Sequence, residues 1–226
     1  MRAVPARPVL YQWLNLPAIK LMGFYSRHVL PHVVHLACST RSAMRQRAEV
    51  VPRAHGRVLE IGFGSGLNLP FYDPQRVRMV WGLDPSPEMH AKAAAAIANA
   101  AMPVDLLSAP ADEIPLEDAS VDTVVTTYTL CTIPDTDAAL AEVRRVLKPG
   151  GELLFCEHGL APDRWMQRQQ ALLNPLWRRL GGGCNLDRRI PAVLEAGGFR
   201  VRELDARYIP GWGPAAFNYR GSATPG

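Results

Sequence analysis

The sequence lacks the features that mark disulfide-rich, secreted and membrane-spanning proteins. Its four cysteines, Cys38, Cys131, Cys156 and Cys184, lie far apart with no CxxC pair, which argues against a disulfide framework and against a structural zinc site. No apolar run approaches the roughly 20 residues that a membrane-spanning helix requires. No apolar stretch followed by a small-residue cleavage site marks a secretory signal. We therefore expect reduced thiols and a cytosolic protein.

Acidic side chains are scarce in the first 57 residues, which hold nine Lys or Arg and a single acid, Glu49. The whole chain has a formal net charge of +4, so a basic arm precedes a mildly acidic body. Prolines interrupt the arm, and aromatic side chains such as Trp13 and Phe24 alternate with basic ones. We predict that residues 1–50 form short helices that cover the body as a lid. Their aromatic and basic composition would also suit peripheral contact with a membrane.

The rest of the chain reads as one α/β domain. The sequence has 226 residues, of which 48% are hydrophobic and 20% charged, as in globular proteins. Short apolar runs alternate with helical stretches at 87–101 and 137–147, the pattern of successive strand–helix units. We predict a Rossmann-like, seven-stranded, mostly parallel sheet with helices on both faces, formed by residues 51–226 behind a helical N-terminal extension. The expected strands are 58–61, 79–83, 104–107, 121–127, 152–156, 199–204 and 217–220.

A glycine-rich turn follows the first expected strand, in the sequence Glu60-Ile-Gly-Phe-Gly-Ser-Gly66. Glycines allow a tight turn and a close approach to a ligand, and we expect a short helix after them, with its free N–H groups at the turn. Asp84 ends the second strand 22 residues after Gly62, where a carboxylate can bind both ribose hydroxyls. Dinucleotide-binding sites have the spacing GxGxxG at this turn, and loops that bind the ATP triphosphate have GxxxxGK[ST]. The chain has neither motif. A phosphate-free adenosine ligand fits best.

These motifs, with Gly82-Leu-Asp84-Pro85-Ser86, Ala111–Leu116 and Leu147–Gly151, resemble the ordered motifs of class I S-adenosylmethionine-dependent methyltransferases, in the branch of the ubiquinone and menaquinone methyltransferases. The resemblance covers about residues 50–220 and implies S-adenosyl-L-methionine as cofactor. It also implies a set of cofactor-binding residues: Glu60, Gly62, Phe63, Gly64, Gly66, Asn68, Asp84, Pro85, Met89, Ala111, Asp112 and Thr127.

The resemblance gives some of these residues separate tasks. Asp84 would hold the ribose, and Pro85 and Met89 would flank the adenine. The backbone around Ala111, with the neighbouring Asp112 carboxylate, would recognise the adenine edge. Thr127, at the end of the fourth strand, would face the methionine or methyl end of the cofactor.

The second half of the chain carries a closer resemblance. Residues 129–133, 155–159 and 182–188 look like the corresponding segments of the methyltransferase-like family that contains the alkyl thiol methyltransferases. This resemblance implies a small lipophilic acceptor, and we prefer a thiol. Two alternatives stay open: methylation of a phospholipid amine or a quinone at a membrane surface, and a cofactor-binding regulatory module without catalysis.

Two side chains are candidates for catalysis. His158 follows the fifth strand, at the sheet edge where ligands bind, and could accept a proton or orient a loop. Tyr128 could wall the acceptor pocket or donate a hydrogen bond. Cys184 has no ligand partner at a suitable sequence spacing, so we expect no metal. Nothing beyond the charge of the basic arm indicates a nucleic-acid surface, so we expect a small-molecule acceptor, with the oligomeric state left open.

Overall fold

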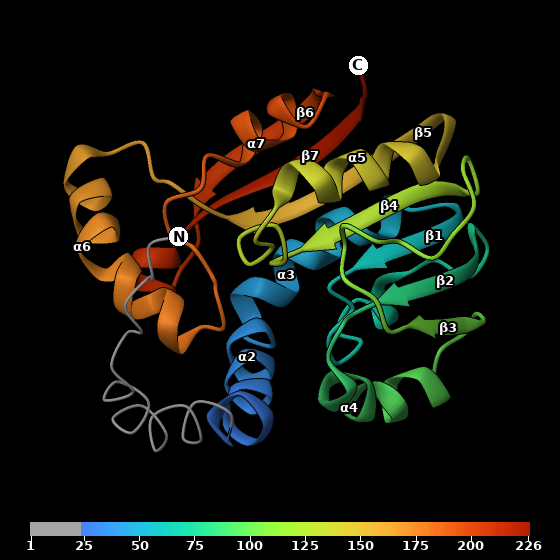
Figure 1. Ribbon diagram of the computed structural model, residues 1–226, viewed down its shortest axis with the longest axis horizontal. Coiled ribbons are helices and arrows are strands. Elements are labelled where there is room, and N and C mark those ends of the chain that lie inside the picture. Colours follow the sequence, from blue (N-terminus) through green and yellow to red (C-terminus); the bar gives the residue numbers. More distant parts are fainter. Residues whose placement is uncertain (1–23) are drawn as a thin grey trace, which may run out of the picture.

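The computed structural model describes residues 24–226, and its frame is a seven-stranded sheet (Figure 1). The strand order is β3-β2-β1-β4-β5-β7-β6, with parallel pairing from β3 to β5 and antiparallel pairing of β7 with both of its neighbours. The predicted fold class is confirmed. The strands are β1 Gly56–Ile61, β2 Val77–Leu83, β3 Val104–Leu107, β4 Val121–Thr127, β5 Leu147–His158, β6 Phe199–Tyr208 and β7 Phe217–Pro225.

Helices cover both faces of this sheet because its strands bury side chains in both directions. On one face, α5 (Thr136–Val146) and α7 (Ile190–Ala196) pack on the odd-numbered side chains of β1. On the other face, α3 (Arg41–Val50) and α4 (Pro87–Ala98) pack over Val58 of the same strand. The Ser86 hydroxyl caps α4 by accepting a hydrogen bond from Met89 N (3.3 Å), as its position in the sequence indicates.

The N-terminal segment is helical from Tyr25 to Cys38 and again from Arg41 to Arg53. A π-helical turn, Tyr25–Val29, leads into α2 (Leu30–Cys38), and α3 is followed by a 3-10 turn, Val51–Arg53. The part of the predicted lid that precedes residue 24 lies outside the described residues. The division at residue 50 stays a prediction, although the buried side chains of α3 belong to the same apolar core as β1, β2 and β4.

Three helical features differ from the sequence prediction, and one of them is α7, which was not expected. The glycine-rich turn is followed by a single 3-10 turn, Leu69–Phe71, with Pro70 inside it, and by no α-helix. The short helix expected there is therefore present only as this 3-10 turn. Between β5 and β6 the chain forms α6 (Arg164–Leu180), a helix that the sequence analysis did not predict and that stands apart from the sheet next to α2 (Figure 1). Within the described residues, no helix is both long and apolar enough to cross a membrane.

Candidate active site

The glycine-rich turn lies where the chain leaves β1 at the carboxyl edge of the sheet. Gly62 has a φ of +71°, and its N–H donates to the Leu83 carbonyl (2.8 Å). A Cβ at Gly62 would lie 2.1 Å from Thr129 Oγ1, so a side chain there would have to displace the loop after β4. The bare backbone of this turn thus forms one wall of an open space.

Asp84 is fixed at the opposite end of the turn. Its Oδ2 accepts a hydrogen bond from Gly64 N, and its Oδ1 accepts one from Ser86 N, both at 2.9 Å. The residue is only 9% exposed. Each carboxylate oxygen can accept a further bond, because one backbone donor uses one lone pair. The carboxylate is therefore held in position and still able to accept two hydroxyl donors.

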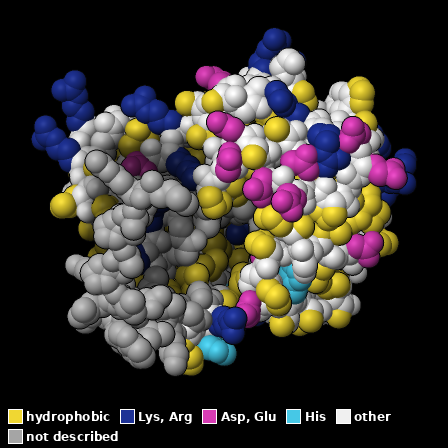
Figure 2. Space-filling view, in the orientation of Figure 1, with side chains coloured by type: hydrophobic (Ala, Val, Ile, Leu, Met, Phe, Trp, Pro, Cys, Tyr) yellow, Lys and Arg dark blue, Asp and Glu magenta, His cyan; other side chains and the backbone are white. Residues whose placement is uncertain are grey.

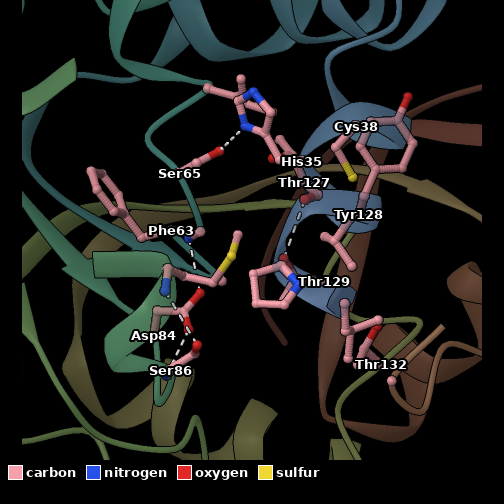
Figure 3. Close-up of a pocket in the computed structure, with 18 of the residues that line it drawn as sticks. His35, Cys38, Phe63, Ser65, Asp84, Ser86, Thr127, Tyr128, Thr129 and Thr132 are labelled. Atoms are coloured by element: carbon pink, nitrogen blue, oxygen red, sulfur yellow. Dashed lines mark hydrogen bonds between the residues drawn. The ribbon is translucent and has the colours of Figure 1, made fainter. Parts of the chain in front are cut away.

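A cavity of about 310 Å³ lies between this turn and α2. In Figure 3, Asp84 and Ser86 lie on one side of it and Cys38 and Tyr128 on the other. Six of the predicted cofactor-binding residues line the cavity: Gly62, Phe63, Gly64, Asp84, Met89 and Thr127. Four predicted residues are not brought to its wall: Gly66, Pro85, Ala111 and Asp112. Their contact with cofactor stays a prediction.

The remaining two predicted residues, Glu60 and Asn68, lie directly behind this wall. Glu60 Oε1 accepts a hydrogen bond from Asn68 Nδ2 (2.9 Å), and Oε2 accepts one from the Tyr72 hydroxyl (2.8 Å). Asn68 Nδ2 also donates to Thr127 Oγ1 in the cavity wall (3.0 Å). Burial raises the pKa of Glu60 to about 7, against the opposing effect of the Tyr72 hydrogen bond.

Arg47 of α3 reaches the same cavity, and the sequence analysis did not single it out. Its Nη1 donates to Asn68 Oδ1 (2.7 Å) and to Thr127 Oγ1, and its guanidinium lies 5.2 Å from the centre of the Tyr128 ring. The side chain is buried, and its Nε has no hydrogen-bond partner among the described residues. All its hydrogen-bond partners there are neutral, so the cavity contains a buried cation with unused donor capacity.

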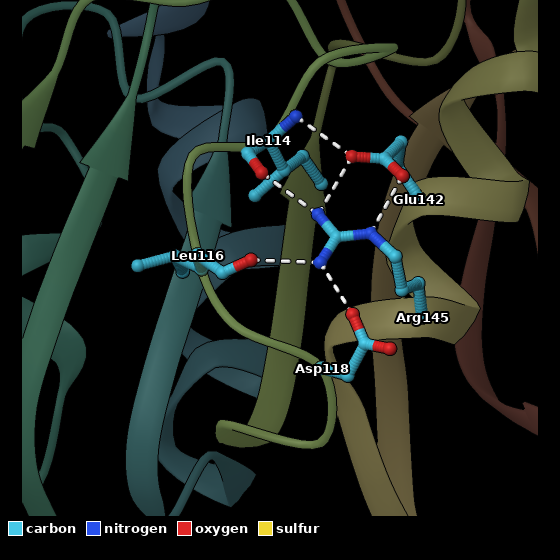
Figure 4. A network of polar contacts seen from close by, with 5 residues as sticks. All are labelled: Ile114, Leu116, Asp118, Glu142 and Arg145. Atoms are coloured by element: carbon cyan, nitrogen blue, oxygen red, sulfur yellow. Dashed lines mark hydrogen bonds and ion pairs between the residues drawn. The ribbon is translucent and has the colours of Figure 1, made fainter.

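A cluster of hydrogen bonds around Arg145 holds the motif Ala111–Leu116 in place. Arg145 of α5 donates to the carbonyls of Ile114 (2.8 Å) and Leu116 (2.7 Å) and to the carboxylates of Glu142 and Asp118 (Figure 4). Glu142 Oε2 also accepts a hydrogen bond from Ile114 N (2.9 Å). We call this cluster the Arg145 clamp. It fastens the loop between β3 and β4 to α5.

Tyr128 stands at the carboxyl end of β4 in an unusual backbone conformation. Its φ is +57°, which a bulky side chain adopts only when its surroundings enforce it. Its N–H donates to the Cys156 carbonyl (2.8 Å), its hydroxyl donates to Asn218 Oδ1 (2.9 Å), and its ring centre lies 4.9 Å from that of Trp212. These contacts hold the ring between two cavities, since Tyr128 lines both.

The second cavity, of about 500 Å³, opens beside the first and is walled mainly by α2 and α6. Most of its lining is apolar, and Figure 2 shows a hollow with hydrophobic side chains inside it on this face of the molecule. Tyr128, Cys38, Val34, Thr132 and Gly181 line both cavities, so the two spaces adjoin. The apolar wall is formed mainly by Val33, Ala37, Leu173, Leu176, Trp177, Leu180, Trp212 and Pro214.

His158 lies in the wall of this second cavity, at the end of β5. Its Nε2 is 3.0 Å from Cys184 Sγ, which is 3.6 Å from Cys131 Sγ. Cys184 has partners after all, because the fold joins residues that lie far apart in the sequence. Hydrogen bonds from Cys131 and His158 lower the pKa of Cys184 despite its burial. Burial opposes the charged form of His158, but the contact with Cys184 outweighs it, so the pKa of His158 is raised.

Comparison with known proteins agrees with this geometry. Residues 59–155 match a family model described as a methyltransferase domain. The chain is 35% identical over 177 residues to the human thiol S-methyltransferase TMT1B, covering 75% of this chain and 72% of the relative. It is 36% identical over 121 residues to phosphatidylethanolamine N-methyltransferase of Cereibacter sphaeroides, covering 53% of this chain and 59% of that protein.

The fold comparison leads to the same class. A solved S-adenosylmethionine-dependent methyltransferase from Methanosarcina mazei superposes with a TM-score of 0.60 at 20% identity, covering 75% of this chain and 92% of that one. The chain belongs to the class I S-adenosylmethionine-dependent methyltransferases. Within that class it is similar to the thiol S-methyltransferases, and S-adenosylmethionine is its methyl donor.

Proposed function

We propose that this protein transfers the methyl group of S-adenosylmethionine to the sulfur of a small lipophilic thiol. The main support is that an apolar cavity of about 500 Å³ adjoins the cavity between the glycine-rich turn and α2. A cavity of this size and polarity suits an apolar small molecule whose reactive atom points toward the shared wall. The similarity to thiol S-methyltransferase TMT1B supports sulfur as that atom.

The first cavity fits the methyl donor. Asp84 would accept hydrogen bonds from the ribose hydroxyls, and the backbone of Gly62 to Gly64 would lie against the methionine part. Arg47 offers a buried cation with an unused Nε donor to the methionine carboxylate. Glu60 and Asn68 would act from behind the wall by fixing Thr127 and the charge balance around Arg47.

The reaction requires little acid–base chemistry from the protein. S-adenosylmethionine supplies an activated methyl group on a sulfonium sulfur. The acceptor sulfur must be deprotonated and held in line with that methyl, which positioning in adjoining cavities can provide. His158 and its partner Cys184 lie in the acceptor cavity, beside the space where the acceptor sulfur would bind. Tyr128 would position both reactants through its place in the shared wall.

An acceptor screen tests this function directly. Release of S-adenosylhomocysteine is measured with lipophilic thiols, phospholipid amines, quinols and phenols. We expect turnover with thiols and little with the others. Faster turnover of phosphatidylethanolamine would instead support amine methylation, which the similarity to the Cereibacter sphaeroides enzyme favours as second candidate. Cofactor binding without turnover on the panel would support a regulatory module.

Two neighbouring leucines of α6 provide a matched control. Leu173 lines the apolar cavity, whereas Leu172 is 80% exposed and does not. Leu173→Asp should raise KM for a lipophilic thiol by about tenfold, because a carboxylate replaces apolar surface against the substrate. Leu172→Asp should leave KM unchanged. Equal effects of the two changes would contradict this cavity as the acceptor site.

The cytosolic location and the peripheral membrane contact of the N-terminal arm stay proposals. Co-sedimentation with vesicles that contain anionic lipid, measured for the full chain and for a chain that begins at residue 24, tests them. Membrane contact through residues 1–23 predicts binding of the full chain alone, and binding by both chains would place the contact in the basic residues after them.

A further inference from the structure

Three metal-ligating atoms from separate parts of the chain meet at the wall of the apolar cavity. Cys184 Sγ lies 3.0 Å from His158 Nε2 and 3.6 Å from Cys131 Sγ. All three atoms lie within 4.8 Å of one another. Cys131 and His158 are buried, and Cys184 is half-buried. Two thiols and one imidazole form a typical ligand set for zinc.

The spacing of these atoms is close to what a tetrahedral ion needs. With zinc–sulfur bonds of about 2.3 Å and zinc–nitrogen bonds of about 2.0–2.1 Å, neighbouring ligand atoms lie roughly 3.5–3.8 Å apart. The two sulfur atoms already have that separation. The contact between His158 Nε2 and Cys184 Sγ is shorter, and a small side-chain rotation would lengthen it. The third pair, Cys131 Sγ and His158 Nε2, lies within 4.8 Å.

Neighbouring residues hold each of the three ligands in place. The Cys131 carbonyl accepts hydrogen bonds from both the backbone N–H and the side-chain Nδ2 of Asn185, each at 2.8 Å, so the two cysteine loops are joined directly. Trp177 Nε1 donates to Cys184 Sγ (3.3 Å), a contact that suits a metal-bound thiolate. His158 ends a central strand whose backbone pairs with β7.

We propose that Cys131, Cys184 and His158 bind one zinc ion and that its fourth position receives the sulfur of the acceptor thiol. Three protein ligands leave one position open, as in catalytic rather than structural zinc sites. The three residues line the acceptor cavity, so the open position faces the space where the thiol would bind. The identity of the fourth ligand rests on the proposed function, whereas the metal site rests on the ligand geometry alone.

The ion would activate the acceptor. On coordination, the thiol loses its proton to water, because a thiol bound to zinc is deprotonated. Its sulfur then forms a bond to the methyl carbon as the bond from that carbon to the sulfonium sulfur breaks. The electron pair of the broken bond stays on the sulfur of S-adenosylhomocysteine. The thioether product is neutral and a weaker ligand than the thiolate, so it can leave the ion.

Charge balance favours this arrangement in a buried site. Zinc with two cysteine thiolates and a neutral imidazole has no net charge. The bound acceptor thiolate adds one negative charge, which the sulfonium of the methyl donor in the adjoining cavity can offset.

Metal analysis of the purified full-length protein tests the site without any acceptor. We expect about one zinc per chain, removable by dipicolinate and restored by added zinc. Cobalt(II) in its place should give the visible bands of a tetrahedral thiolate centre. A chain that binds neither metal at micromolar concentration would overturn the inference.

Variants identify the ligands. Cys131→Ser, Cys184→Ser and His158→Ala should each weaken zinc binding by on the order of 100-fold or more. Cys38→Ser is the matched control, since Cys38 lines the same cavity without belonging to the cluster, and it should bind zinc like the wild type. Thermal unfolding of each variant verifies that it is folded. Retention of full zinc affinity by folded Cys184→Ser would contradict the site.

A final measurement separates the metal site from the proposed function. Addition of a lipophilic thiol should shift the cobalt(II) spectrum, which shows coordination at the open position. Zinc binding without thiol turnover would leave the metal site standing and remove the thiol function. Full thiol turnover by the zinc-free protein would leave the function standing and remove this role of the metal.

Discussion

Two glutamate–arginine pairs in this protein differ in how directly they meet. In the Arg145 clamp, the guanidinium donates directly to Glu142, and this hydrogen bond lowers the pKa of Glu142. Beside the cofactor cavity, Asn68 stands between Arg47 and Glu60, bonding to both. Burial therefore dominates, and the pKa of Glu60 rises to about 7.

The two arginines differ in whether their hydrogen-bond donors all have partners among the described residues. Arg145 has two carboxylates and two carbonyls as partners, which accounts for its donors. Arg47 is buried with neutral partners and an unpaired Nε. A buried cation is costly unless it is paired, so its persistence beside a cavity indicates an anionic group that binds there.

The largest expected effect concerns the two glutamates and pH. The pKa of Glu60 is raised from 4.5 to about 7 in the folded chain. Its protonation therefore stabilises the fold fully below pH 4.5, and this contribution is lost as the pH rises through about 7. Relative to Glu60→Gln, the wild-type free energy of unfolding should fall by on the order of 3 kcal/mol between pH 4.5 and pH 8. Chemical denaturation across this range measures the difference.

Glu142→Gln is the control, because the pH dependence of the free energy of unfolding should have the opposite sign. The folded-state pKa of Glu142 is lowered, so its contribution is present above its ordinary value and lost as the pH falls. The same pH trend in both variants would contradict the distinction between the two pairs.

Asp84→Ala should weaken binding of S-adenosylmethionine by about 1.5–3 kcal/mol, because two ribose hydroxyls lose a charged acceptor. Calorimetry measures the affinity. Asp118→Ala, which removes a carboxylate of the Arg145 clamp, should leave it unchanged. Binding to Asp84→Ala within about twofold of the wild type would remove the ribose contact.

Arg145→Met should lower the free energy of unfolding by about 2 kcal/mol, because the loop between β3 and β4 loses its hydrogen bonds to the guanidinium. Cofactor affinity should stay within about twofold, since the clamp does not line the cavity. Denaturant unfolding and calorimetry on one preparation test both statements. A large loss of cofactor affinity with an unchanged free energy of unfolding would show that Arg145 serves cofactor binding and not the stability of the fold.

Arg47→Met makes the same substitution in the other pair. We expect S-adenosylmethionine to bind about tenfold more weakly, through loss of a bond to its carboxylate. Decarboxylated S-adenosylmethionine should bind equally to variant and wild type. An equal loss for both ligands would show that Arg47 acts on the shape of the cavity and not on the carboxylate.

The sequence was sufficient for the sheet because its strands are local patterns. Residues 104–107 and 121–127 form β3 and β4 with the predicted bounds. The short helix expected after the glycine-rich turn is only a 3-10 turn, Leu69–Phe71, which ends before a second turn forms. The sequence analysis ended this strand at Leu204, whereas β6 continues to Tyr208. Apolar and polar residues alternate over this extension, a strand pattern that the analysis did not use.

The site was only partly predictable from the sequence. Residues of one strand–turn unit were found, whereas residues that only tertiary packing brings together were not. Asp84 and Gly62 were found by their spacing in one strand–turn unit. Arg47 was hidden among the arginines of a basic helix, and only the packing of α3 on the sheet distinguishes it. Cys131 and Cys184 lie 53 residues apart, and no sequence pattern joins them.

The bond between Tyr128 and Asn218 ties the wall between the two cavities to the far side of the sheet. Asn218 belongs to β7, which inserts between β5 and β6 although it follows both in the sequence. The strained backbone of Tyr128 is thus held by two strands, since its N–H bonds to β5 and its hydroxyl bonds to β7. A change in β7 far along the chain from the glycine-rich turn can therefore alter the space in which both reactants would meet.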